Sequence, residues 1–314
     1  MNKIKRLFIS ATAIVLISSG ITYQVCKNRN KSFDKYLKKF QSDQKDDLLI
    51  CAHRGYSSLE VENTYKAIDL ASSENYVDCI EIDARMTKDG EIVLSHDNVI
   101  YNEERGMIKV SELSYDEISN MTFSYYKLPS LNFFWYDDEQ IMMNDRDKSL
   151  NNQKYQLISL TEGIQACGDK LIIIDLKFNN DVKEFTEKLK QEIVNPSNII
   201  FQSFDIESLL YLQNNSNFQC MPLVDSISDL KYIKYFNGVS IEKSLVTYDL
   251  IKEFVDNNMI IAIWTINTSD EINSVLDKVD GYYKKIIYIT NYPDLILTRI
   301  NERRNDKNLI KTNI

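Results

Sequence analysis

The sequence predicts an α/β fold of the TIM type, a (β/α)8 barrel whose eight parallel strands alternate with helices. Nine short apolar runs rich in β-branched residues are separated, in most cases, by amphipathic stretches, and this alternation is typical of a parallel sheet. One run is antiparallel, because Lys88-Asp89-Gly90 between the second and third runs indicates a tight hairpin. Eight runs remain for a barrel, and the body from 48 to about 300 has the roughly 250 residues of such barrels.

The predicted strands follow one another along the whole of this body. In chain order they are LLICA (48–52), CIEID (79–83), EIVLSH (91–96), LIIIDLK (171–177), IIFQSF (199–204), QCMPLV (219–224), GVSI (238–241), IIAIWTI (260–266) and IIYIT (286–290). With the hairpin turn at about 88–90, His96 on the return strand is expected opposite about residue 82. Residues 301–314 form a polar tail after the barrel.

The N-terminus predicts a membrane segment over residues 1–25. A basic cluster precedes an uncharged stretch from Leu7 to Val25, close to the about 20 apolar residues that span a membrane. We expect a single-pass signal anchor with the catalytic body outside the cytoplasm. A cleaved signal peptide and secretion are the alternative, because the strongest apolar part ends at Ile17 and small residues follow. Residues 26–47 are a polar spacer.

Composition limits the partners of the barrel. The formal net charge is −9 and the pI is about 5.0, so nucleic acid is not an expected partner, since its phosphates need a basic surface. A phosphate-bearing substrate must instead be bound locally by a metal or a few cations. The five cysteines are widely spaced, odd in number and form no C-x-x-C pair, so neither a zinc knuckle nor a disulfide framework is indicated; most are expected to be buried. The oligomeric state stays open.

Polar residues gather at the ends of the predicted strands. Glu81 and Asp83 alternate with isoleucines, so both carboxylates lie on one face of their strand. Asp175 and Lys177 repeat this spacing after an apolar run. Neighbouring buried carboxylates are costly unless a cation or protons relieve their repulsion. Three of them suit Ca²⁺ or Mg²⁺ better than zinc, although a polar edge strand also explains E-x-D alone.

The two histidines of the chain, His53 and His96, each follow an apolar run, and each is a candidate acid or base. A lone histidine at a strand end is more often structural, and it is the acidic neighbours that favour catalysis. Arg54 and Lys177 offer positive charge to a phosphodiester, with surface ion pairs as the alternative. Trp264, at the end of a late strand, lines either a substrate pocket or the barrel rim.

The ordered set of motifs resembles the glycerophosphodiester phosphodiesterase family, one of the phosphatidylinositol-phospholipase-C-like TIM-barrel phosphodiesterases. The motifs are His53-Arg54-Gly55, Glu62-Asn63-Thr64, Glu81-x-Asp83, Thr87-Lys88-Asp89-Gly90, His96-Asp97, Leu160-Thr161-Glu162, Asp175-x-Lys177, Ser203-Phe204-Asp205, Trp264-Thr265-x-Asn267 and Thr290-x-x-Pro293. Three positions depart from the family pattern: Asp175 replaces Glu, Val61 replaces Pro, and Asn291 replaces Asp. An insertion at about 98–156, with an aromatic, acidic run at 133–139, matches the family poorly.

The resemblance implies a role for each matching residue. Those roles are acid and base for His53 and His96, metal ligation for Glu81, Asp83 and Asp175, phosphate contact for Arg54 and Lys177, and support of the site for Glu62 and Asn63. The implied reaction is the metal-dependent hydrolysis of a small or lipid-derived glycerophosphodiester to glycerol phosphate and an alcohol, through a cyclic phosphate. Two alternatives are a phospholipase D-like or polyglycerol-phosphate (teichoic-acid-type) cleaving enzyme on the same barrel, and an inactive surface-displayed binding protein.

Overall fold

The structure is a computed structural model that describes residues 48–125, 145–146, 148–178, 181–282 and 286–312, with side chains up to Arg303. The expected membrane segment (1–25), the spacer (26–47) and the aromatic, acidic run of the insertion lie outside these residues. Among the helices of the described part, none combines the length and the apolar character that crossing a membrane requires. The N-terminal anchor therefore stays a prediction.

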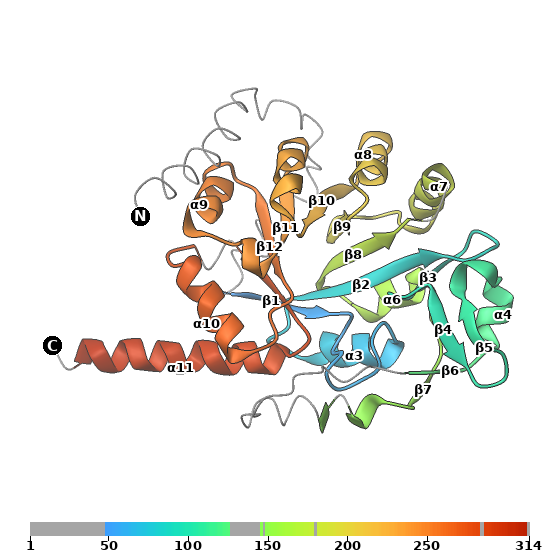
Figure 1. Cartoon of the computed structure of the whole chain (residues 1–314), viewed down its shortest axis with the longest axis horizontal. Helices are drawn as coiled ribbons and strands as arrows, with labels where there is room; N and C mark the ends of the chain where they lie inside the picture. The colour runs from blue at the N-terminus through green and yellow to red at the C-terminus, as the bar shows by residue number, and fades with distance from the viewer. Residues whose placement is uncertain (1–47, 126–144, 147, 179–180, 283–285, 313–314) are drawn as a thin grey trace.

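Eight parallel strands close into a barrel, as predicted. In barrel order they are β1 (Leu49–His53), β2 (Cys79–Met86), β8 (Leu171–Lys177), β9 (Ile199–Ser203), β10 (Gln219–Val224), β11 (Gly238–Glu242), β12 (Ile260–Trp264) and β13 (Ile286–Thr290). Strand β1 pairs in parallel with both β2 and β13, which closes the sheet (Figure 1). All eight strands therefore end at the same mouth, where their last polar side chains meet.

The ninth run is the antiparallel strand β3 (Ile92–Leu94), which pairs with β2 through the predicted turn. Gly90 has φ of 83°, the left-handed backbone that this turn requires. Ala84 pairs with Leu94, so the register carried two residues further sets His96 opposite residue 82. The hairpin and its register are thus confirmed, and His96 is brought back to the mouth of the barrel.

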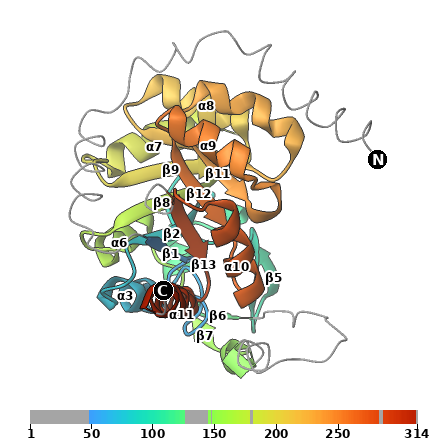
Figure 2. The ribbon, with the colours of Figure 1, turned by 90° about the vertical axis from the view of Figure 1, so that its left-hand side faces the viewer.

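Helices surround the barrel on the outside (Figures 1 and 2). They are α3 (Tyr65–Ser73), α6 (Leu160–Ala166), α7 (Val182–Glu192), α8 (Ile206–Asn215), α9 (Tyr248–Asp256), α10 (Ser269–Lys278) and α11 (Pro293–Thr312), with the 3-10 turns η2 (Ile227–Tyr235) and η3 (Lys243–Leu245). Capping boxes start α6 at Ser159 and α10 at Thr268. Helix α11 runs through residue 300, so the expected polar tail continues it.

The insertion forms a small antiparallel sheet beside the barrel mouth, in the order β5-β4-β6-β7 (Figure 1). Its elements are β4 (Val99–Asn102), β5 (Gly106–Lys109), η1 (Val110–Glu112), α4 (Tyr115–Ser119), β6 (Phe123–Ser124) and β7 (Lys154–Tyr155). A separate apolar cluster around Val110, Ile118 and Phe123 supports it. Arg146 donates to Asp294 at the start of α11 through its two terminal guanidinium nitrogens, Nη1 at 3.3 Å and Nη2 at 2.8 Å. This ion pair connects the insertion to the barrel.

The barrel interior is filled below the mouth by side chains that alternate along the strands. Cys51, Cys79, Ile173, Ile200 and Met221 belong to this inner cluster, while their strand neighbours pack outward against the helices. The four described cysteines are buried and free, as expected. Because this inner cluster is apolar, the polar inward-facing residues two positions further along several strands, such as Glu81, Asp175 and Gln202, form a floor for a site at the mouth.

Candidate active site

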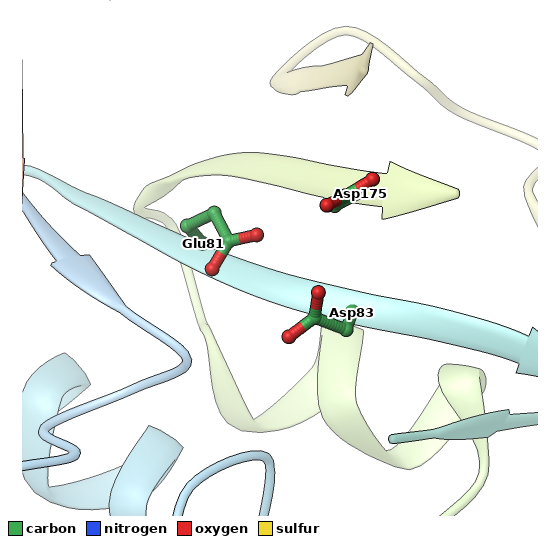
Figure 3. A group of neighbouring side chains, drawn as sticks. All are labelled: Glu81, Asp83 and Asp175. Carbon is green, nitrogen blue, oxygen red and sulfur yellow. The ribbon is translucent and has the colours of Figure 1, made fainter. Parts of the chain in front are cut away.

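Three buried carboxylates form the centre of the site. Glu81 and Asp83 project from β2 and Asp175 from the neighbouring β8, and Figure 3 shows the three groups turned toward one another. Each offers an oxygen, and these oxygens all lie within 4.8 Å of one another. Period-two alternation puts Glu81 and Asp83 on one face, and the pairing of Asp83 with Asp175 sets the third carboxylate beside them.

Two cations partly balance this negative charge. Lys177 Nζ lies 2.6 Å from Asp175 Oδ2 and 3.1 Å from Asp83 Oδ1, and Arg54 Nε lies 3.3 Å from Asp83 Oδ2. Burial opposes the ionisation of Asp83, but Arg54 and Lys177 outweigh it and hold the pKa of this carboxyl well below its usual range. Of the three carboxyls, Asp83 is therefore the one whose ionised form the two cations favour.

The other two carboxylates lack sufficient positive charge. Burial raises the pKa of Asp175 to about 6, although Lys177 opposes the shift, and burial together with Asp83 raises the pKa of Glu81 well above its usual range. Asp175 Oδ1 is buried and has no hydrogen-bond partner among the described residues. Divalent cations such as Ca²⁺ and Mg²⁺ prefer oxygen ligands that carry negative charge. The three carboxylates therefore have the chemistry that would hold such a cation.

The loop after β1 brings Arg54 to the carboxylates. Its backbone N–H donates to Glu81 Oε2 at 3.0 Å, and its Nη1 donates to Glu62 Oε1 at 2.7 Å. This approach uses left-handed backbone, with φ of 60° at Arg54 and 77° at Gly55. In this structure both predicted phosphate-binding residues, Arg54 and Lys177, are engaged by carboxylates.

Asn63 holds Asp83 through two hydrogen bonds. Its Nδ2 donates to Asp83 Oδ2 at 2.8 Å, and its Oδ1 accepts from the Asp83 backbone N–H at 2.9 Å. The φ of Asn63 is 57°, a conformation that asparagine tolerates better than most residues. Glu62 and Asn63 therefore lie beside the cluster, Asn63 by direct contact with Asp83 and Glu62 through Arg54.

His53 ends β1 and faces the cluster. Its Nδ1 lies 2.6 Å from Asn291 Oδ1, and its Nε2 lies 3.8 Å from Glu81 Oε2. An amide oxygen only accepts hydrogen bonds, so Nδ1 carries the proton and Nε2 presents its lone pair to the site. Burial, and next the charge of Arg54, lower the pKa of His53 to about 3, which keeps the imidazole neutral at neutral pH.

His96 follows β3 and comes to the site from the hairpin. Its Nδ1 lies 2.8 Å from Asp97 Oδ1, and the Arg85 guanidinium donates to its backbone carbonyl at 2.6 Å. The hydrogen bond from His96 lowers the pKa of Asp97, so a carboxylate anion stays beside the imidazole. His96 also lines a cleft of about 320 Å³ between the barrel and the insertion, together with Glu62 and Asn63.

Trp264 ends β12 and is half-buried. Its ring packs against the inner cluster and meets Phe204 edge to face, with centroids 5.6 Å apart. Its Nε1 is buried without a hydrogen-bond partner in the described part of the chain. The side chain thus contacts the barrel interior on one side and the half-exposed Phe204 at the rim on the other. Both interpretations offered by the sequence agree with this position.

Sequence reasoning missed the place of two inward-facing residues in the site. Asn291 stood out only as a departure from the family pattern, but it accepts from His53. Gln202 is buried at the level of the carboxylates, and no sequence motif singled it out. A signal existed in each case, because the two residues stand two positions beyond the inner-cluster residues Ile289 and Ile200.

A closed parallel barrel with a buried cluster of three carboxylates and two histidines at its mouth is an arrangement that suits a TIM-barrel hydrolase. The chain belongs to the glycerophosphoryl diester phosphodiesterase family, whose model matches residues 53–282, and it is an enzyme of the phosphoric diester hydrolase class. The family and the barrel predicted from the motifs are therefore confirmed.

Relatives and solved structures agree with this assignment. A glycerophosphodiester phosphodiesterase of Bacillus subtilis is 24% identical over 276 residues, which is 80% of this chain and 85% of the relative. A phosphodiesterase of Oleispira antarctica, solved in complex with the product sn-glycerol-3-phosphate, has a TM-score of 0.59 at 17% identity, over 81% of this chain and 96% of the other. A glycerophosphodiester phosphodiesterase of Thermotoga maritima has a TM-score of 0.58 at 18% identity, over 81% and 99%. The two solved structures show that the fold is shared.

Proposed function

We propose that the enzyme hydrolyses glycerophosphodiesters to glycerol phosphate and an alcohol, with a divalent cation held by Glu81, Asp83 and Asp175. The observation that carries the proposal is the buried group of three carboxylates with a histidine, His53, against one of them. The glycerol phosphate bound by the Oleispira antarctica relative supports the substrate class.

The cation we propose is Ca²⁺ or Mg²⁺, because its ligands are all carboxylate oxygens. When bound, it supplies neutralisation of charge on the phosphoryl oxygens and acidifies a nearby hydroxyl. Arg54 and Lys177, which contact the same carboxylates, add positive charge for the two non-bridging oxygens of the phosphodiester. A phosphodiester anion resists attack, and this concentration of positive charge lowers that barrier.

We assign the base to His53 and the acid to His96. The assignment rests on their surroundings, since burial keeps His53 neutral, whereas His96 has the carboxylate of Asp97 2.8 Å from its Nδ1. His53 Nε2 accepts the proton of the attacking hydroxyl, and His96 donates a proton to the oxygen of the departing alcohol. For the second step the roles reverse, with His96 taking a proton from water.

We propose that the attacking group is the substrate's own glycerol 2-hydroxyl. Its oxygen forms a bond to phosphorus while the bond between phosphorus and the alcohol oxygen breaks, which leaves a cyclic phosphate. Water then opens the ring to glycerol phosphate. A hydroxyl tethered beside the phosphorus avoids much of the entropy cost of recruiting a free water.

A substrate lacking that hydroxyl tests the reaction. Glycerophosphocholine should be hydrolysed on the order of 10²-fold or more faster than its 2-deoxy analogue, and phosphorus NMR should detect the cyclic phosphate during turnover. Exhaustive chelation should abolish the hydrolysis of glycerophosphocholine and the formation of the cyclic phosphate, and Ca²⁺ or Mg²⁺ should restore them. Equal rates with no cyclic species would mean direct attack by water. Full activity after chelation would remove the cation from the mechanism.

A phospholipase D-like activity on lysophospholipids is the second candidate, and one observation favours it. The cleft beside His96 is lined largely by apolar and aromatic side chains, among them Val99, Ile100, Met107 and Tyr125. Such a lining suits an acyl chain on the glycerol. The kcat/KM for lysophosphatidylcholine relative to glycerophosphocholine separates the two, and a ratio far above one would favour this candidate.

A further inference from the structure

Gln202 lies in one row with two of the carboxylates. Asp83 on β2 pairs with Asp175 on β8, and Asp175 pairs in turn with Gln202 on β9. The next position of the row, on β10, is Met221 of the apolar inner cluster. Paired residues on adjacent strands stand about 4.8 Å apart, so Gln202 is close to Asp175. Since methionine has no side-chain oxygen, Gln202 is the last residue in this direction of the row that could offer an oxygen to a cation.

The side chain of Gln202 points into the barrel and is held there. The residue before it, Phe201, packs outward against Phe218 with ring centroids 4.6 Å apart, so alternation turns Gln202 inward. The residue after it is anchored as well, since Ser203 Oγ donates to the Leu176 carbonyl at 2.7 Å. The strand therefore cannot rotate Gln202 away from the carboxylates without breaking these contacts.

Two unsatisfied oxygens face this part of the site. Gln202 is 3% exposed, and its Oε1 is buried without a hydrogen-bond partner among the described residues. Asp175 Oδ1 is in the same condition one strand away. A buried acceptor with no donor costs about 1–3 kcal/mol, and two such acceptors side by side are explained when a cation lies between them.

We infer that Oε1 of Gln202 is a further protein ligand of the cation site, an inference that rests on the proposed metal dependence. Amide oxygens are ordinary ligands of Ca²⁺. The carboxyl of Asp175 reaches one methylene less far than a glutamate at that position, and the longer Gln202 on the neighbouring strand supplies an oxygen on the same side. The rival arrangement turns the amide around, so that its Nε2 donates to Asp175 and orients that ligand without touching the ion.

Counting the waters on a bound lanthanide separates the two arrangements. Eu³⁺, a hard cation that takes oxygen ligands as Ca²⁺ does, is bound to the full-length chain, and its luminescence lifetime is compared in H₂O and D₂O. Gln202→Met keeps the length of the side chain but removes the hard oxygen. We expect this variant to bind Eu³⁺ at least about tenfold more weakly and to show one more coordinated water than the wild type.

Two further variants serve as a substitute and as a control for Gln202→Met. Gln202→Ala should show the same gain of one water, should the methionine variant fail to fold by circular dichroism. Ser240→Ala is the matched control, because Ser240 is also buried and its hydroxyl has no hydrogen-bond partner in the described part of the chain, but it lies on β11 rather than beside Asp175. It should leave both Eu³⁺ affinity and the water count unchanged.

The possible results overturn different statements. Weaker Eu³⁺ binding with an unchanged water count would mean that Gln202 acts through Asp175. Unchanged Eu³⁺ binding with an unchanged water count would exclude any role of Gln202 in the site. Either result overturns the inference and leaves the proposed function intact. A wild-type chain that binds no Eu³⁺ at this site would overturn the cation site itself, and with it the metal dependence of the proposed function.

Discussion

The Nδ1 atom of His53 lies 2.6 Å from the Oδ1 atom of Asn291, although 238 positions separate the two residues in the sequence. Strand β1 closes the barrel against β13, and their register brings the end of one to the end of the other. The contact fixes the tautomer of His53 and aims its Nε2 at the carboxylates. The hydrogen bond to this uncharged partner raises the pKa of His53, but too little to offset the lowering by burial.

Asn291→Asp should raise the pKa of His53. A carboxylate within hydrogen-bond distance of an imidazole stabilises the imidazolium, typically by about 1–3 pKa units. The acidic limb of the pH–rate profile should therefore move to higher pH, with activity lost earlier as the pH falls. The control Asn214→Asp adds the same charge at an exposed position and should leave the limb in place. An unmoved limb in Asn291→Asp would show that Asn291 does not govern the protonation of His53.

Alanine at either histidine should lower kcat by about 10²-fold or more, the range of general acid–base contributions. Each variant should retain a normal melting temperature, since His53 is held by one side-chain contact and His96 is partly exposed. Steady-state kinetics on glycerophosphocholine measures the effect, and the wild-type profile should be bell-shaped. Near-normal turnover in one variant would remove that histidine from the mechanism.

The carboxyl of Asp175 should make the metal-free protein less stable as the pH rises. Its folded pKa of about 6 lies above the unfolded value of about 3.9, so its stabilising contribution is complete below about pH 4 and is lost as the pH passes 6. In chelator, wild type should lose on the order of 1–3 kcal/mol of unfolding free energy relative to Asp175→Asn between these pH values. Urea unfolding measures this difference. An equal pH dependence in both proteins would contradict the raised pKa.

Two glycines with left-handed backbone should respond differently to alanine. At Gly106, φ is 74° and an added Cβ meets no atom of the described residues within 4 Å, so backbone strain of about 1–2 kcal/mol is the expected cost. At Gly55, φ is 77° and the Cβ would lie 2.6 Å from the backbone carbonyl carbon of Ala67 in α3, which adds a clash. Gly55→Ala should therefore lose about 2 kcal/mol or more beyond Gly106→Ala in urea unfolding. Equal losses of unfolding free energy in the two variants would mean that the loop after β1 relaxes to accommodate the added Cβ at Gly55.

The predicted N-terminal segment should decide where the enzyme is found in the cell. Residues 7–25 are uncharged and nearly long enough to cross a membrane, so the full chain should fractionate with membranes. A chain starting at Lys45 should be soluble and retain activity, because the barrel begins with β1 at Leu49. Fractionation followed by immunoblotting measures the distribution. Full-length protein recovered free in the cytosol would contradict the anchor.

Short-range patterns were sufficient for the strands of the barrel sheet and for two of the central residues. Apolar runs and the Asp-Gly turn identified the nine strands of the barrel sheet, since each depends on neighbours a few positions away, but they did not identify the short strands β4 to β7 of the insertion. Period-two alternation alone likewise places Glu81 and Asp83 on one face of β2. That Asp175 joins them followed from the strand-end pattern only because parallel strands end at one mouth.

Contacts between distant segments were decided by the tertiary structure alone. Nothing near His53 in the sequence indicates Asn291, and nothing near Asp175 indicates that Gln202 stands level with it. These pairs depend on the register in which strands meet, and a shift of one residue would turn every side chain of a strand to its other face. The sequence by itself thus determined which residues face inward along each strand, whereas closure of the barrel decided which of them meet.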